Sequence, residues 1–85
     1  MFGKKKAAAA AADWERRGRA AADERMAEQD RAEANARAEK WGRLARLSAA
    51  KGYDASKQIA IDARAQALQD ARDAEIRALN AKRRR

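Results

Sequence analysis

The sequence contains no cysteine, histidine, proline, valine or threonine, and these absences exclude several kinds of site. Without cysteine there is no disulfide, and without cysteine or histidine there is no standard zinc site. Nucleophilic catalysis would depend on Ser48 or Ser56, the two serines, with no histidine to act as their base. We therefore expect a protein that is not an enzyme and that carries no cofactor or metal ion.

Large hydrophobic side chains are also scarce. Alanine supplies 26 of the 85 residues, whereas only 13 residues have a large apolar side chain. Complete burial of one such side chain contributes about 1.5 to 3 kcal/mol, while ordering the chain costs about 1.5 kcal/mol per residue. Because so few large side chains do not offset that cost, we expect an oligomer or a subunit of a larger complex.

Long apolar runs are missing as well. No segment reaches the roughly 18 apolar residues that a membrane-spanning helix needs, so membrane insertion is not expected. The alanine run at 7–12 is too short for a secretory signal and is followed at once by Asp13 and Glu15. We expect a protein that is not secreted through a signal peptide.

The residues that are present favour helix. Alanine, arginine, glutamate, glutamine, lysine and leucine dominate, and no proline interrupts them. Five acid-before-base pairs at spacing four also predict solvent-facing helix surface. These are Asp13 with Arg17, Glu15 with Arg19, Glu33 with Arg37, Glu39 with Arg43, and Asp73 with Arg77.

One break in the helical pattern is predicted near Gly52. Glycine suits the left-handed position after a helix end, Lys51 complements the helix dipole, and Asp54 or Ser56 could cap a second helix. The sequence thus predicts an all-α unit over 1–85. Its expected parts are a basic, alanine-rich arm at 1–12, helices at 13–50 and 55–82, a turn at 51–54 and a basic tail at 83–85. The alternative is one continuous long helix.

Alanines in the second half of the chain fall on one helical face. Seven of them are spaced by three or four residues, namely Ala60, Ala63, Ala67, Ala71, Ala74, Ala78 and Ala81. In an antiparallel hairpin that folds back at Gly52, residues whose numbers sum to 105 face each other, so that Ala38 meets Ala67. The residues expected to pack helices are Ala27, Ala34, Ala38, Trp41, Leu44, Ala45, Ala60, Ile61, Ala63, Ala67, Leu68, Ala71, Ala74, Ile76, Ala78 and Leu79.

Large side chains suggest two further features. The same register sets Leu44 against Ile61 and Met26 against Leu79, and the large residues near Gly52 are expected to form a small core at the turn.

A second stripe repeats about every eleven residues, which predicts straight helices or slight right-handed coiling. This stripe consists of Ile61, Ala65, Leu68, Arg72, Ile76 and Leu79. Since one hairpin cannot cover two helix faces, we expect an oligomeric helical bundle.

Positive charge is concentrated at the two ends of the chain. The net charge is +8, with +4 in residues 1–19, −2 in 20–40, +3 in 41–60 and +3 in 61–85. Basic runs attract polyanions such as nucleic acid, or an acidic protein surface. The residues expected to make this contact are Lys4, Lys5, Lys6, Lys82, Arg83, Arg84 and Arg85.

Trp14 lies apart from the other large residues, so a packed core does not account for it. Arg16, Arg17 and Arg19 follow it closely, and tryptophan and arginine dominate the energetics of protein interfaces. Alternatively, a tryptophan beside arginines could stack on a nucleic-acid base. We expect Trp14 to anchor an interface.

Two segments carry a compositional resemblance to a known group of proteins. They resemble the Ala, Gln and Arg-rich helices of internal, ejection or portal-associated virion proteins of short-tailed bacteriophages. The two segments are RAAADERMAEQDRAEANARA at 19–38 and IDARAQALQDARDAEIRALNAKRRR at 61–85. The resemblance implies a helical, oligomeric structural protein of the virion, close to the genome. It assigns no functional residue.

The leading hypothesis is therefore a structural subunit of a multi-chain assembly, as a homo-oligomer or with other subunits. Its basic termini would contact DNA, RNA or acidic neighbours, and its location would be the virion. Alternatives are a ribosome- or nucleoid-associated nucleic-acid-binding protein in the cytoplasm, or an accessory subunit of an organellar complex. Acids interspersed with the bases favour the structural subunit over the dedicated nucleic-acid binder.

Overall fold

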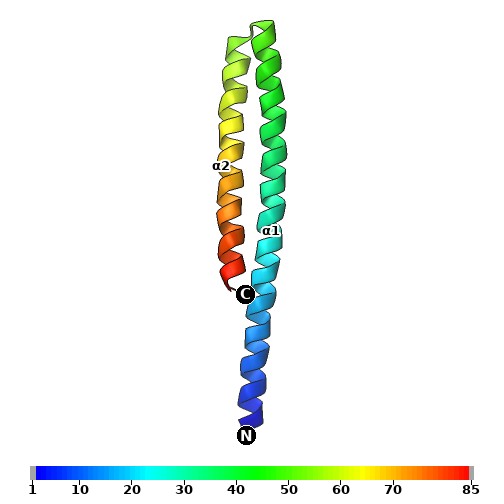
Figure 1. Cartoon of the computed structure of the whole chain (residues 1–85), viewed down its shortest axis with the longest axis vertical. Coiled ribbons are helices and arrows are strands. Elements are labelled where there is room, and N and C mark those ends of the chain that lie inside the picture. The colour runs from blue at the N-terminus through cyan, green and yellow to red at the C-terminus, as the bar shows by residue number, and fades with distance from the viewer. Residues whose placement is uncertain (1, 85) are drawn as a thin grey trace.

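The chain forms two helices joined by a two-residue turn. In a computed structural model that describes the backbone of residues 2–84 and the side chains of residues 7–84, helix α1 spans Phe2–Lys51 and helix α2 spans Asp54–Arg84 (Figure 1). No strand occurs in this part of the chain. The molecule is a rod of 76 × 13 × 12 Å. The all-α prediction with two helices is confirmed.

The helices are longer than the sequence predicts. The arm at 1–12 is helical from Phe2, since alanine and lysine have high helix propensity and nothing interrupts them. The tail is helical through Arg84, and Asp54 already belongs to α2. The turn is therefore Gly52 and Tyr53 rather than 51–54. No helix in the described residues is long and apolar enough to cross a membrane.

The turn follows the backbone geometry that commonly ends helices at glycine. Gly52 has a φ of 76°, the left-handed region that costs glycine no strain. The N–H of Tyr53 donates to the carbonyl of Ser48 at 2.9 Å, and the N–H of Gly52 donates to that of Ala49 at 3.2 Å. These two bonds make a Schellman motif, which satisfies the last carbonyl groups of α1.

After the turn, α2 runs back along the second part of α1 (Figure 1). Ion pairs between the two helices extend from Arg37 and Asp70 to Asp23 and Arg84. Because α1 has 50 residues and α2 has 31, the first part of α1 continues past the end of α2. This overhang, residues 2–19, corresponds to about 27 Å of single helix.

The core between the helices consists of alanine. The buried hydrophobic residues are Ala20, Ala27, Ala34, Ala38, Ala60, Ala67, Ala71, Ala74 and Ala81. In each helix the buried alanines recur at intervals of seven, as in Ala60, Ala67, Ala74 and Ala81. Seven is the repeat of coiled-coil contacts, and the eleven-residue repeat predicted above belongs to a different stripe of α2. We call the buried contact the alanine seam.

Candidate assembly and polyanion-contact surfaces

The alanine seam contains most of the alanines that the sequence assigns to helix packing. Ala27, Ala34 and Ala38 from α1 are at most 4% exposed, and so are Ala60, Ala67 and Ala74 from α2. Ala71 is also buried, while Ala45, Ala63 and Ala78 are half-buried. Short methyl side chains let two helix backbones approach closely, but they remove little apolar area from water. The seam therefore fixes geometry more than it supplies stability.

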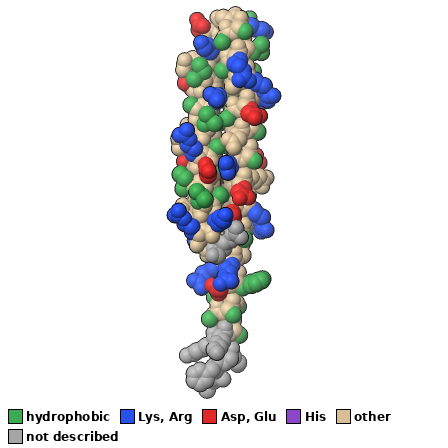
Figure 2. Space-filling view, in the orientation of Figure 1, with side chains coloured by type: hydrophobic (Ala, Val, Ile, Leu, Met, Phe, Trp, Pro, Cys, Tyr) green, Lys and Arg blue, Asp and Glu red, His purple; other side chains and the backbone are tan. Residues whose placement is uncertain are grey.

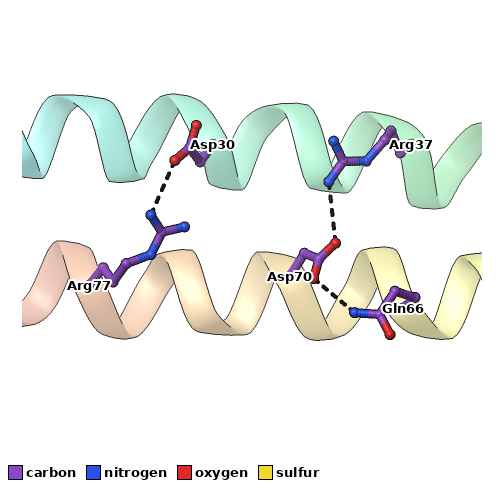
Figure 3. Close-up of polar contacts among 5 residues, drawn as sticks. All are labelled: Asp30, Arg37, Gln66, Asp70 and Arg77. Carbon is purple, nitrogen blue, oxygen red and sulfur yellow. Dashed lines mark hydrogen bonds and ion pairs between the residues drawn. The ribbon is translucent and has the colours of Figure 1, made fainter.

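Cross-helix ion pairs line one edge of the alanine seam. Arg84 contacts Asp23 at 3.1 Å, Arg77 contacts Asp30 at 3.3 Å and Arg37 contacts Asp70 at 3.5 Å (Figure 3). The Nε2 of Gln66 also donates to Asp70 at 3.0 Å, and this bond holds the carboxylate toward α1 (Figure 3). The paired side chains are 41% to 60% exposed, so each ion pair contributes at most about 1 kcal/mol. Their number and even spacing favour one register.

Sequence reasoning missed these cross-helix pairs. It assigned Arg37 to Glu33 and Arg77 to Asp73 within one helix, and both assignments are wrong because each arginine turns toward the other helix. Of the five predicted local pairs, the described structure forms only Asp13 with Arg17, at 3.2 Å. The missed signal was the seven-residue spacing of Asp23, Asp30 and Arg37 in one helix and of Asp70, Arg77 and Arg84 in the other.

Most large hydrophobic side chains lie outside the alanine seam. Leu44, Leu47, Tyr53, Ile59 and Ile61 are all exposed, so the small core expected at the turn is not formed. The expected pairs of Leu44 with Ile61 and of Met26 with Leu79 do not bury their side chains either. Because alanines fill the contact between the helices, these larger side chains lie outside it and remain exposed. Trp41 is half-buried.

Most of the second predicted stripe is exposed. Ile61 is 40% exposed, Ile76 is 56% exposed and Leu79 is 51% exposed, while Leu68 between them is half-buried. Together with Ala65 and Arg72, both exposed, these residues form an apolar strip on α2 that we call the outer stripe. In a single chain, the outer stripe remains in contact with water.

The fold brings basic residues from both ends of the chain together. Arg16 and Arg19 of the overhang line a hollow with Arg84, around Ala20 and Asp23. Asp13 binds Arg16 and Arg17, so acids balance part of this charge. Figure 2 shows bases and acids mixed along the visible face of the rod, with basic side chains also on the overhang.

The predicted basic residues are described to different extents. Lys82, Arg83 and Arg84 are exposed in the last turn of α2. The backbone of Lys4, Lys5 and Lys6 belongs to α1, but their side chains lie outside the described residues, as does Arg85.

Trp14 is the most exposed large hydrophobic residue in the described structure, at 78%. With Arg17, Gly18 and Ala21 it lines a shallow groove on the overhang. Position 18 has open space where a Cβ atom would be. The indole is therefore accessible to a partner, beside a guanidinium group.

Comparisons of the chain with known protein families, with curated proteins and with solved structures found no match.

Candidate metal ligands do not cluster in the described residues. No cluster of three or more aspartate or glutamate side chains that could hold a metal ion occurs there. Ser48 is half-buried near the end of α1, and Ser56 is exposed in the first turn of α2. Ser48 takes part in the turn through its backbone carbonyl.

Proposed function

We propose that this chain is a non-enzymatic structural subunit that works as an antiparallel helical hairpin within a multi-chain helical assembly. The observation that carries the proposal is a mismatch between the side chains that are buried and those that are exposed. Among the side chains of residues 7–84, all nine buried hydrophobic residues are alanine, whereas nine large hydrophobic residues are exposed. Burial of large side chains is the dominant stabilising contribution to folding, so a partner that covers them would supply what the alanine seam does not.

The outer stripe is the surface that best fits such packing. It presents three large aliphatic side chains, Ile61, Ile76 and Leu79, on the exposed face of α2. Helices bury an apolar face of this kind against other helices. In the assembly we propose, the alanine seam holds the hairpin together and the outer stripe joins it to its neighbours.

The basic hollow where α2 ends beside the overhang suits a contact with nucleic acid or with an acidic neighbour. Arg84 joins Arg16 and Arg19 there although it lies far from them in the sequence. Guanidinium groups bind phosphate and carboxylate groups in a forked geometry. The compositional resemblance suggests a phage virion as the setting, where subunit packing and contact with the genome would both be used.

A second candidate function is that of a small nucleic-acid-binding protein. The observation in its favour is Trp14, which is accessible and lies beside Arg17 in one groove. Stacking of an aromatic ring with a neighbouring arginine is typical of proteins that bind single strands. Such a protein would lose nucleic-acid binding when Trp14 is changed, whereas a structural subunit would lose self-association or partner binding.

The proposal is tested by the native mass of the chain and of two variants. The monomer mass is 9.4 kDa, and we expect light scattering to give a larger mass that rises with concentration. Replacing Ile61, Ile76 and Leu79 by glutamine should shift the mass toward the monomer. The control variant carries glutamine at Ala32 and Ala36, which are exposed on α1, and should retain the wild-type mass.

Two results would contradict the structural assignment. One is a monomer at every concentration that unfolds in a sharp two-state transition. The other is an assembly whose mass is unchanged by the outer-stripe substitutions. A monomer that binds an oligonucleotide through Trp14 would favour the second candidate.

A further inference from the structure

The hairpin carries a second arginine cluster, far from the chain termini. Arg43 and Arg46 from α1 and Arg64 from α2 line one hollow on the side of the hairpin. The remaining lining residues are Asn35, Ala38, Glu39, Gly42 and Leu68. Three arginines and one glutamate, Glu39, are among the lining residues, so their charges sum to +2. We call it the arginine hollow.

Arg64 reaches the arginine hollow from α2 and lies against α1. The cross-helix ion pairs join residues whose numbers sum to 107, and the same register continued toward the turn sets Arg64 opposite Arg43. The side chain of Arg64 passes over Gly42. A Cβ atom added at Gly42 would lie 3.4 Å from Nε and 3.5 Å from Cδ of Arg64.

Gly42 helps to explain why the cluster forms. This glycine lies inside a continuous helix with ordinary backbone angles, where glycine is less favourable than alanine. The turn geometry that requires glycine at position 52 is therefore absent at position 42. Because Gly42 has no side chain, the side chain of Arg64 can lie close to the backbone of α1 at this position.

None of the three arginines forms an ion pair with a described carboxylate. Arg16, Arg17, Arg37, Arg77 and Arg84 all do. Guanidinium groups gathered without carboxylate partners repel one another, and an anion that bridges them relieves the repulsion. A phosphate group suits them because its oxygens accept the forked hydrogen bonds of several guanidinium groups.

We infer that the arginine hollow binds a phosphate group through Arg43, Arg46 and Arg64. The phosphate can be free in solution or part of a nucleic-acid backbone, and the chemistry of recognition is the same. This site is separate from the basic termini, and the inference does not depend on the assembly proposed above.

Trp41 provides a readout because it directly precedes Gly42, against which the side chain of Arg64 lies. In a Trp14→Phe background it is the single tryptophan of the chain. We expect inorganic phosphate to change its fluorescence saturably, whereas chloride at equal ionic strength should not. A dT12 oligonucleotide, added in a parallel titration, tests phosphate carried on a backbone.

Variants within the cluster are compared with charge-matched controls. Arg64→Gln and the double variant Arg43→Gln and Arg46→Gln should each weaken binding about three- to tenfold, the range for an exposed charge-assisted contact. The control for the single variant is Arg25→Gln, and the control for the double variant is Arg25→Gln with Arg31→Gln. These controls remove the same charge from exposed positions of α1 outside the hollow and should leave binding nearly unchanged. Circular dichroism establishes that each variant keeps its helicity.

The outcomes separate the two phosphate sources. A response to inorganic phosphate that depends on the cluster indicates a site for the free ion. A cluster-dependent response to dT12 alone indicates a site for the backbone. The inference is overturned if neither ligand changes Trp41 fluorescence, or if the cluster variants bind as their charge-matched controls do.

Discussion

At the scale of single residues, glycine has different roles at different positions of the two helices. Gly52 adopts a positive φ that L side chains rarely adopt, so the turn depends on it. Gly18 lies in the helical overhang with open space around the position of a Cβ atom. Substitution by alanine should therefore have opposite effects at these two positions.

We expect Gly52→Ala to destabilise the chain by about 1 to 2 kcal/mol, the cost of a left-handed conformation for a residue with a Cβ atom. Gly18→Ala should raise helix stability by about 0.5 to 1 kcal/mol, since no contact opposes the new methyl group. Urea unfolding monitored by circular dichroism measures both effects. A stabilising Gly52→Ala substitution would mean that the turn is not the one described here.

At the scale of the helices, the alanine seam packs closely but contributes little stabilising free energy. Its side chains fill the space between two closely packed backbones, so added methylene groups have nowhere to go. Its buried area is nevertheless small because each residue contributes one methyl group. The seam should thus be more sensitive to larger side chains than to the loss of any one ion pair beside it.

Replacing Ala67 and Ala71 by leucine should disrupt the hairpin, because overpacking a tight contact costs about 1 to 3 kcal/mol. The matched control is Ala36→Leu, which adds the same atoms at an exposed position and should be nearly neutral. Thermal unfolding and native mass measure the outcome. Unchanged values for the double variant would mean that the seam does not hold the helices together.

Much of this arrangement follows from local sequence signals. Helix propensity indicates both helices, glycine indicates the turn, and alanine spacing places Ala38 and Ala67 in the buried face. The cross-helix pair of Asp30 with Arg77 was not predicted, since local spacing rules offer each charge a nearer partner. The arginine hollow was also missed, because it depends on the side chain of Arg64 in α2 lying against Gly42 of α1.

At the scale of the whole molecule, the overhang is an appendage to the paired helices. The described side chains from Ala7 to Arg19 are all exposed or half-buried, and Ala20 is the first buried one. The stability of the pair should therefore depend little on this segment. Polyanion binding should depend on it strongly, because it carries three lysines near the start of the chain.

Deleting residues 1–15 should change the thermal midpoint by less than about 3 °C, as expected for surface residues. The affinity for duplex DNA should fall, and the salt dependence should become shallower by up to about 3 in log–log slope as three lysine contacts are lost. Titrations at several salt concentrations measure both. A much larger fall in the midpoint would show that the overhang packs against the rest of the assembly.

The turn end of the 76 Å rod differs in chemistry from the place where α2 ends beside the overhang. Leu47, Tyr53 and Ile59 are exposed near the turn, whereas Arg16, Arg19 and Arg84 line one hollow where α2 ends. Each rod therefore has a direction. If several rods lay side by side with the same orientation, the array would have a band of apolar side chains at the turns and a band of arginine side chains where the α2 helices end. A layer built in this way would distinguish its two sides without any further component.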